Sequence, residues 1–129
     1  MQMAGKFHDV FCSMLMTQVC WILQELHDEG WIYRDIKASN FMLEVNGKLK
    51  LIDLGLAKRI GKKRTYTVCG TVHSMPPEVL LGTSKEGYSY EFDYYGLGVL
   101  IYELTVGVPP FGYHTTNSNI KQGTVYNYM

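Results

Sequence analysis

The chain has 129 residues, 47% of them hydrophobic, so it is long and apolar enough to fold around a core. Twelve basic and twelve acidic residues give a formal net charge of zero, which argues against a general attraction to nucleic acid. The cysteines, Cys12, Cys20 and Cys69, form no CxxC pair, and no signal peptide or membrane span is recognisable. We therefore expect a cytoplasmic protein with no membrane or nucleic-acid partner.

Apolar residues recur at helical spacing near the beginning of the chain. They are Phe7, Phe11, Leu15, Val19, Ile22 and Leu26, with Val10, Met14 and Trp21 alongside. This spacing predicts one long amphipathic helix over residues 7 to 28, ended by Gly30.

A polar stretch comes next and carries side chains suited to phosphoryl transfer. It reads Tyr33-Arg34-Asp35-Ile36-Lys37-Ala38-Ser39-Asn40, and Asp53-Leu54-Gly55 follows later. Such a reaction needs metal ligands, a cation on the phosphate and a carboxylate that orients the attacking hydroxyl. Asp35 can accept the hydroxyl proton, and Lys37 points the same way in an extended loop. Asn40 and Asp53 offer the oxygen ligands that magnesium prefers.

The residues between Asn40 and Asp53 predict a β-hairpin. Two strand-like runs, 41–45 and 48–52, flank Asn46-Gly47, a strong signal for a two-residue turn because both residues tolerate positive φ. A tight hairpin brings Asn40 and Asp53 to the same end of a ribbon. An isolated Asp-Leu-Gly is more often a surface turn, but loop, hairpin and acidic turn in this order favour a metal site.

The middle of the chain is basic and then rich in turn residues. Five of the seven residues from Lys58 to Arg64 are cationic, a pattern that usually marks a solvated face. A lone histidine, His73, has no partner at ligand spacing and is expected to be structural or solvent-facing.

The last third predicts a second helix over residues 91–104. It is apolar around most of its circumference, as in a buried helix. Asp93 near its beginning complements the helix dipole, and Pro109-Pro110 cannot continue it. Residues 113–129 are expected to form a loop and a frayed end.

These motifs resemble the catalytic loop HRDxKxxN and the DFG metal motif of eukaryotic protein kinases. The sequence of residues 56–71 is most similar to that of the cyclic-nucleotide-dependent branch of the AGC serine/threonine kinases. The resemblance implies an α+β fold, the mainly helical C-terminal lobe of a kinase with a small β-hairpin at the catalytic site. Residues 1–129 would form one partial kinase domain that uses ATP and Mg²⁺ to phosphorylate protein hydroxyls.

The resemblance also implies roles for individual residues. Asp35 would be the base, Lys37 would bind the transferred phosphate, and Asn40 and Asp53 would bind magnesium. Met42 would lie under the adenine, which completes the cofactor-binding set.

Residue Thr67 occupies the activation-loop phosphorylation position of these kinases. A phosphate there would be bound by Arg34 and Lys58 and would order the loop. An unmodified loop threonine is the alternative.

Four further residues match structural or substrate-binding positions. Thr71 matches a threonine that hydrogen-bonds the catalytic Asp and Lys, and Asp93 matches an aspartate that holds the catalytic-loop backbone. Glu78 ends a Pro-Pro-Glu version of the Ala-Pro-Glu motif, and its arginine partner, much later in kinases, is missing, so a buried position would be costly. Glu103 matches an acid that binds an arginine of the substrate in these kinases. Ser39 stands where they have a second such acid. We therefore expect a basic protein substrate, bound with a weaker preference for arginine than in these kinases.

The glycine-rich loop, the strand lysine and its glutamate partner, and the closing helices of a kinase are not found in this sequence. We therefore expect the isolated chain neither to bind ATP tightly nor to phosphorylate a substrate. Either a regulatory subunit or further domain supplies the missing surface, or the sequence is a truncated product or an incomplete gene model. The alternative is a non-catalytic kinase-like fragment that acts as an interaction or regulatory module. Intact Asp35, Lys37, Asn40 and Asp53 favour an enzyme lineage.

Overall fold

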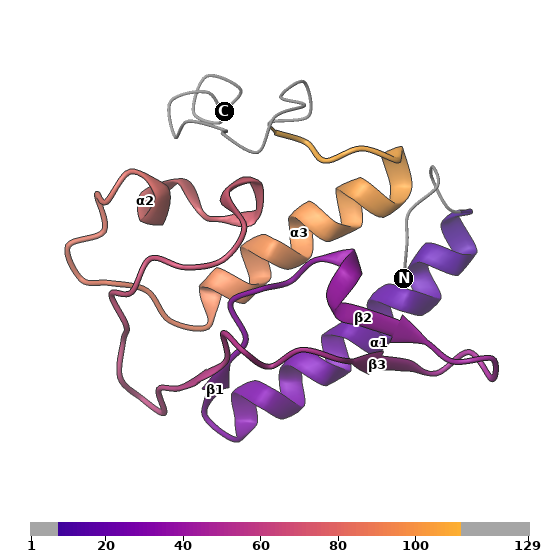
Figure 1. Ribbon diagram of the computed structural model, residues 1–129, viewed down its shortest axis with the longest axis horizontal. Helices are drawn as coiled ribbons and strands as arrows, with labels where there is room; N and C mark the ends of the chain where they lie inside the picture. The colour runs from indigo at the N-terminus through magenta and orange to yellow at the C-terminus, as the bar shows by residue number, and fades with distance from the viewer. Residues whose placement is uncertain (1–7, 112–129) are drawn as a thin grey trace.

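The computed structural model describes residues 8–111, which form helices and two small antiparallel sheets (Figure 1). In chain order the elements are α1 (Asp9–Asp28), β1 (Trp31–Ile32), the 3-10 helix η1 (Ala38–Asn40), β2 (Phe41–Leu43), β3 (Leu49–Leu51), β4 (Lys58–Arg59), the 3-10 helix η2 (Val72–Ser74), α2 (Pro77–Leu80) and α3 (Glu91–Val106). The expected α+β class, mainly helical with a small hairpin, is confirmed. No helix within these residues is long and apolar enough to cross a membrane.

Helix α1 confirms the predicted helix and corrects part of its buried face. The His8 side chain caps its beginning by accepting a hydrogen bond from the Val10 amide at 3.3 Å, and Phe7 lies outside the described residues. The core-facing residues are Cys12, Leu15, Val19 and Leu23. Val10, Met14 and Trp21, which accompany the apolar spacing in the sequence, lie on the opposite helix face, where all three are exposed.

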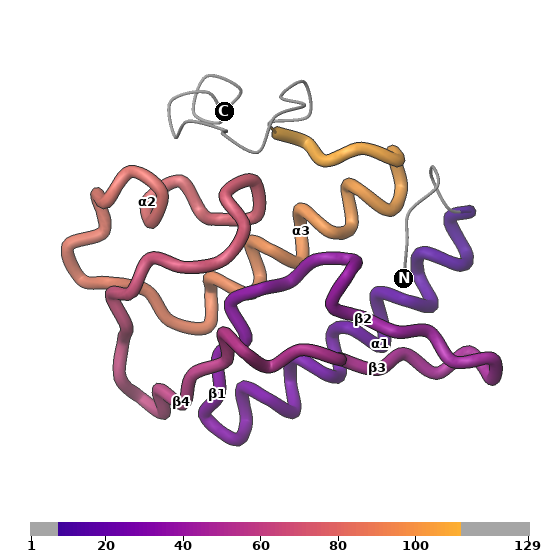
Figure 2. Tube along the Cα trace, viewed as in Figure 1, coloured from indigo at the N-terminus to yellow at the C-terminus, as the bar shows by residue number. Residues whose placement is uncertain are grey.

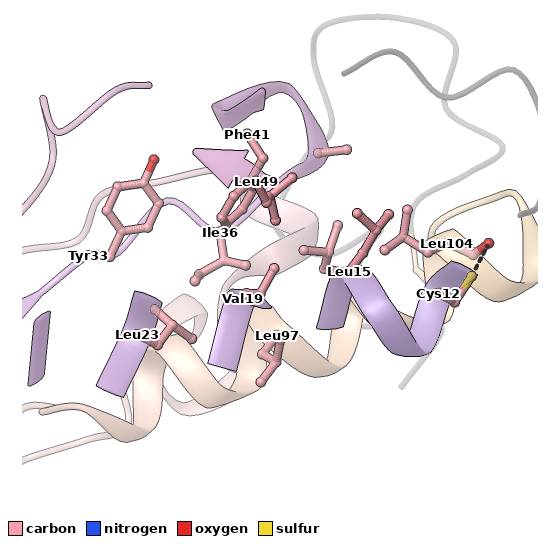
Figure 3. Packing of buried hydrophobic residues seen from close by; sticks show 12 residues of the cluster. Cys12, Leu15, Val19, Leu23, Tyr33, Ile36, Phe41, Leu49, Leu97 and Leu104 are labelled. Atoms are coloured by element: carbon pink, nitrogen blue, oxygen red, sulfur yellow. Dashed lines mark hydrogen bonds between the residues drawn. The ribbon is translucent and has the colours of Figure 1, made fainter. Parts of the chain in front are cut away.

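The main core lies between α1 and α3 and is closed by the hairpin (Figure 3). Leu15, Leu100 and Leu104 are almost completely buried there. The Cys12 thiol donates to the Leu104 carbonyl oxygen at 3.6 Å. Burial, followed by the nearby charge of Asp9, raises the pKa of that thiol. This packing fixes the two long helices against each other.

The predicted hairpin is present, but its turn differs from the prediction. Strands β2 and β3 pair in the register Phe41↔Leu51, Met42↔Lys50 and Leu43↔Leu49. Only Gly47 in the turn has positive φ, at 86°, and its amide bonds the Glu44 carbonyl at 2.9 Å. The connection is therefore a three-residue loop with a glycine bulge rather than a two-residue turn. Gln18 of α1 anchors it, since the side chain bonds Gly47 O at 3.0 Å and Leu49 N at 2.8 Å.

Strands β1 and β4 form the second sheet, beside the end of α1 (Figure 2). Gly30 ends α1 with φ of 84°, and its carbonyl accepts the amides of Ile60 and Gly61 at 2.8 and 3.1 Å. A second core lies on this side, made of Ile32, Ile60, Met75, Val79, Leu80, Tyr88 and Phe92. The chain that follows Asp53 thereby returns to residues 30–32, which directly precede Tyr33.

Helix α3 confirms the second predicted helix but is less buried than predicted. Phe92, Leu97 and Leu104 face the core, whereas Tyr94 and Tyr102 are exposed, with Ile101 and Val106. The reason is that only α1 and η2 make substantial packing contacts with it among the described elements. Gly107, with φ of 97°, ends the helix before Pro109-Pro110. The loop expected over residues 113–129 lies outside the described residues.

Candidate active site

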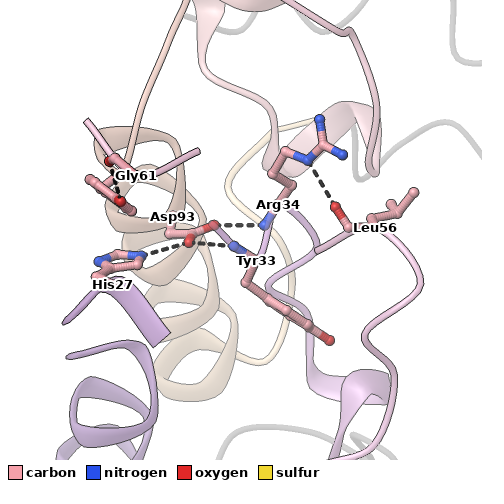
Figure 4. A network of polar contacts seen from close by, with 7 residues as sticks. His27, Tyr33, Arg34, Leu56, Gly61 and Asp93 are labelled. Carbon is pink, nitrogen blue, oxygen red and sulfur yellow. Dashed lines mark hydrogen bonds and ion pairs between the residues drawn. The ribbon is translucent and has the colours of Figure 1, made fainter. Parts of the chain in front are cut away.

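A buried carboxylate organises the segment before Asp35 (Figure 4). Asp93 on α3 is 0% exposed and accepts the Tyr33 amide at 2.8 Å and the Arg34 amide at 2.7 Å. His27 of α1 lies with its Nε2 atom 2.7 Å from the same carboxylate, and its ring lies against Tyr90 and Tyr94. Because a carboxylate only accepts, His27 Nε2 carries the proton of this bond. Asp93 thus joins α1, α3 and the catalytic-loop backbone.

Arg34 has an unusual backbone conformation in this network. Its φ of 69° makes it the non-glycine residue with positive φ in the described part of the chain, a conformation that costs energy and is found at functional sites. Its guanidinium is buried and bonds the Leu56 carbonyl at 2.8 Å and the Tyr88 hydroxyl at 3.3 Å. The residue before Asp35 is therefore held through both backbone and side chain.

Glycine at position 70 is required by the approach of this strained segment. Gly70 has φ of 98°, and a Cβ added there would lie 2.8 Å from the Arg34 carbonyl oxygen. We predict that Gly70→Ala lowers the free energy of unfolding by about 2–4 kcal/mol, since backbone strain and a steric clash add.

The matched control for that substitution is Gly47→Ala. Gly47 has φ of 86° but no atom within 4 Å of an added Cβ, so only the conformational cost of about 1 kcal/mol is expected. Urea unfolding of both variants measures the difference. Equal losses would contradict the close approach of Gly70 to Arg34.

Asp35, Lys37 and Asn40 lie together at the catalytic loop. Lys37 has extended backbone, with φ of −155° and ψ of 157°, and its Nζ atom lies 3.7 Å from Asp35 Oδ2. The Asn40 side-chain amide donates to the Asp35 carbonyl oxygen and to Asp35 Oδ2, both at 2.8 Å. Asn40 is buried, whereas the Lys37 side chain is 37% exposed. These donors hold the Asp35 carboxylate, and neither bond uses Asn40 Oδ1.

The hairpin brings Asp53 beside Asn40, as predicted. The amide of Ile52, the residue before Asp53, donates to the Asn40 carbonyl oxygen at 3.0 Å. Asp53 is exposed, and its Oδ1 atom accepts the Gly55 amide at 2.8 Å. Among residues 8–111 no group of three His, Cys, Asp or Glu side chains could hold a metal. A two-ligand site fits magnesium, which keeps water and phosphate oxygens as its other ligands.

The buried Tyr33 side chain lies close to both carboxylates. It is 0% exposed, and burial raises its pKa above the usual value, with Asp35 and Asp53 raising it further through their charges. The phenol therefore stays protonated at neutral pH. Met42 lies in the hairpin opposite Lys50, and its side chain is exposed.

The residues assigned to the activation loop are brought together only in part. The Lys58 ammonium donates to Thr65 Oγ1 at 3.0 Å rather than to Thr67. Thr67 is exposed, and its carbonyl oxygen accepts the Tyr88 hydroxyl. Arg34 thus reaches Thr67 through Tyr88.

Thr71, Glu78 and His73 lie in or beside the segment that contains η2 and α2. The Thr71 carbonyl accepts the Ser74 amide at 3.0 Å, and within the described residues its side chain makes no hydrogen bond to Asp35 or Lys37. Glu78 is exposed, so the burial cost considered for it does not arise. His73 is half-buried; burial lowers its pKa, while the charge of Glu103 raises it and that of Lys37 lowers it.

The sequence did not predict the contacts of three residues in this region. His27 bonds Asp93, Tyr88 bonds Arg34 and Thr67, and the Arg64 guanidinium bonds Glu91 Oε1 at 2.6 Å and Gly87 O at 2.9 Å. The only sequence feature that could have indicated a role for His27 is its position in the last turn of a predicted helix. Tyr88 and Arg64 have no such feature, because their partners are distant in sequence or are backbone atoms.

The fold and the catalytic-loop geometry define a protein of the kinase class, and comparisons with known proteins agree. The family model described as "Protein kinase domain" matches residues 1–128. The chain therefore belongs to the protein kinase family.

The most similar relatives include cyclic-nucleotide-dependent kinases. The chain is 42% identical over 124 residues to cGMP-dependent protein kinase 2 of Rattus norvegicus, covering 95% of this chain and 15% of the relative. It is 39% identical over 111 residues to Serine/threonine-protein kinase SCH9 of Saccharomyces cerevisiae, covering 86% and 13%. It is 38% identical over 112 residues to a cAMP-dependent protein kinase catalytic subunit-like protein of Caenorhabditis elegans, covering 87% and 27%. The resemblance to AGC kinases is thus confirmed, and the chain spans a minor part of each of these relatives.

Proposed function

We propose that this chain supplies the catalytic-loop and metal-binding part of a serine/threonine protein kinase, which transfers the γ-phosphoryl group of ATP to a protein hydroxyl. The observation that carries the proposal is the joint placement of Asp35, Lys37 and Asn40, with Asp53 linked to Asn40 through the Ile52 amide. These are the groups that such a transfer needs, at a position where they can act on one substrate.

Each residue has a distinct role in the proposed reaction. Asp35 orients the substrate hydroxyl and accepts its proton, since Asn40 and Lys37 hold its carboxylate in place. Lys37 is exposed enough to swing from Asp35 to the transferred phosphate as a point charge. Asn40, through Oδ1, and Asp53 would hold Mg²⁺, which when bound neutralises charge on the phosphates. Met42 offers an apolar surface for the adenine ring.

Phosphorylation of Thr67 is the proposed regulation of this site. Thr67 is exposed and can be reached by an activating kinase. Arg34 is linked to the Thr67 carbonyl oxygen through the Tyr88 hydroxyl, and Lys58 bonds the side chain of Thr65, two residues before Thr67. A phosphate there would gain charge-assisted hydrogen bonds from both cations. Arg34 adjoins Asp35, so this pairing would stabilise the catalytic loop.

The substrate is proposed to be a protein with a basic residue near the phosphorylated hydroxyl. Glu103 on α3 is half-buried and close enough to His73 for its charge to act on that ring. Ser39 is exposed beside Asn40 and carries no charge. Glu103 alone would therefore bind the basic residue of the substrate, which weakens the preference for basic substrates. Thr71 and Glu78 would shape the substrate loop.

We place this activity in the cytoplasm because the three cysteines of the sequence form no CxxC pair.

A groove beside α1 marks where a further part of the kinase or a regulatory subunit is proposed to pack. Its volume is about 450 Å³, and it is lined by Ile22, Leu26, Trp31, Leu51 and Leu54 together with Glu25 and Glu29. The Trp31 and Leu54 side chains are exposed. Apolar surface of this kind commonly marks an interaction site. The same groove favours the alternative function, a non-catalytic module that binds a partner.

Transfer of labelled phosphate from ATP to a basic serine peptide separates these proposals. The isolated chain is expected to give no transfer above background. A chimaera in which this chain replaces the aligned 124 residues of rat cGMP-dependent protein kinase 2 is expected to give activity, because it restores the rest of the domain. A folded but inactive chimaera would favour the interaction module. Transfer by the isolated chain would refute the expectation that it is inert alone.

A further inference from the structure

A buried tyrosine connects the segment around Thr67 to the catalytic loop. Tyr88 lies between α2 and α3 with 3% of its surface exposed. Its ring packs on that of Phe92 with a centroid distance of 4.7 Å, and Phe92 directly precedes Asp93. Tyr88 is therefore fixed to the same helix turn that holds the Tyr33 and Arg34 amides.

The backbone of Tyr88 pairs with the segment before Thr67. The Thr65 amide donates to the Tyr88 carbonyl oxygen and the Tyr88 amide donates to the Thr65 carbonyl oxygen, both at 2.9 Å, as an isolated antiparallel bridge. Gly87 permits this approach, since a Cβ added there would lie 2.5 Å from Thr65 O. Thr65 is consequently 2% exposed, although its neighbours Tyr66 and Thr67 are exposed.

The hydroxyl of Tyr88 makes two bonds to functional residues. It donates to the Thr67 carbonyl oxygen and accepts from the Arg34 guanidinium at 3.3 Å. A hydroxyl has one hydrogen to donate, so these two bonds use it as both donor and acceptor. Burial raises the pKa of Tyr88, opposed by its bond to Arg34. The phenol accordingly keeps its proton at neutral pH.

We propose that Tyr88 is a positioning residue whose hydroxyl ties the segment 65–67 to Arg34 without any phosphate on Thr67. This inference rests on the proposed function, since it concerns the regulation of the same site. The segment is already ordered through Tyr88 before modification. A phosphate on Thr67 would then add bonds to Arg34 and Lys58 rather than create the order of the loop.

The Arg34 guanidinium has enough N–H groups for both links. A guanidinium has five N–H groups, and the bonds to Leu56 O and the Tyr88 hydroxyl use Nε and one terminal nitrogen. The other N–H groups can bind a phosphate. Tyr88 and a phosphorylated Thr67 would therefore stabilise the same Arg34 conformation and would not compete for it.

The test is amide hydrogen exchange by NMR in the 129-residue chain carrying Tyr88→Phe. This change keeps the ring packing and removes only the hydroxyl. We expect the Thr65 amide to exchange about tenfold faster, the loss expected for one or two hydrogen bonds of ordinary strength. The Tyr33 and Arg34 amides, which bond Asp93, are expected to keep their rates and report that the fold is intact.

Two further variants complete the experiment. Tyr90→Phe is the matched control, because the Tyr90 hydroxyl also bonds a backbone oxygen, that of Gly61 at 2.6 Å, and its loss is expected to leave Thr65 exchange unchanged. Thr67→Ala removes the phosphorylation position and is likewise expected to leave it unchanged.

Three results would overturn the proposal. One is a Thr65 exchange rate in Tyr88→Phe no faster than in Tyr90→Phe. Another is equal acceleration of the Thr65 and Arg34 amides, which would mean general destabilisation. The third is acceleration by Thr67→Ala alone. Because hydrogen exchange requires no catalysis, this result is independent of the phosphate-transfer assay, which tests the proposed function itself.

Discussion

Replacing Asp93 by alanine is expected to lower the free energy of unfolding by about 3–5 kcal/mol. The carboxylate is fully buried and accepts three bonds, from the Tyr33 and Arg34 amides and from His27. Alanine would leave all three donors buried without an acceptor, and each such group costs about 1–3 kcal/mol. It would also release the strained backbone of Arg34. Thermal unfolding followed by circular dichroism measures the loss, expected as a drop in Tm of roughly 10 °C or more.

Two variants sharpen this prediction. Asp93→Asn keeps the shape and one acceptor oxygen, so a smaller loss is expected than for alanine. Glu91→Gln is the control, because Glu91 lies in the same helix turn but is exposed, and its bond to Arg64 at 2.6 Å is a surface ion pair. Such pairs contribute about 0–1 kcal/mol. If Asp93→Ala and Glu91→Gln cost the same, the buried network does not hold the catalytic loop.

In the kinase chimaera, Asp35→Asn is expected to lower kcat by about 10²–10⁴-fold, the usual contribution of general acid–base catalysis. Asparagine keeps the size of the side chain and an oxygen for the Asn40 amide, which lies 2.8 Å from Asp35 Oδ2. It cannot accept the proton of the substrate hydroxyl. The loss should therefore fall on kcat, while KM for ATP changes little.

A surface aspartate provides the control for this loss. Asp28 ends α1, is exposed and accepts a hydrogen bond from Gln24 at 2.8 Å. Asp28→Asn is expected to leave kcat unchanged. The free energy of unfolding of the Asp35→Asn chain, measured by thermal unfolding, should match that of the parent within about 1 kcal/mol, since the Asn40 side-chain amide keeps an acceptor. A fully active, folded Asp35→Asn chimaera would exclude Asp35 as the base.

Local features of the fold could be predicted from the sequence because they depend on spacing. The two long helices follow from their apolar residues, and the hairpin follows from Asn46-Gly47 between strand-like runs. The juxtaposition of Asn40 and Asp53 follows from that hairpin. In these cases residues close in sequence determine the geometry.

Other features depend on which face of an element meets another. Trp21 belongs to the apolar residues of the predicted helix, but the core forms on the face that carries Leu15 and Val19, so Trp21 is exposed. The sequence of α3 is apolar around most of its circumference, as in a buried helix, yet Tyr94 and Tyr102 are exposed where no described element covers them. Periodicity identifies a helix without saying how much of its surface is covered.

The polar contacts of the site were the hardest to predict. Asp93 lies 66 residues from His27 in the chain, and no local pattern pairs them. Tyr88 acts through backbone atoms of Thr65 and Thr67, which carry no sequence signature. The three-residue turn at Gly47 was missed because Asn46 tolerates positive φ without adopting it.

We propose that Asn40 and Asp53 form one divalent-cation site beside Asp35. Titrating the ¹⁵N-labelled chain with sub-stoichiometric Mn²⁺ tests it directly, because the paramagnetic ion broadens NMR signals only near its binding site. We predict selective broadening of the Asn40 side-chain amide and of the Asp53 and Gly55 backbone amides, abolished by Asp53→Asn. Broadening centred instead on the exposed acids at the end of α1, Glu25, Asp28 and Glu29, or unchanged in Asp53→Asn, would contradict the claim.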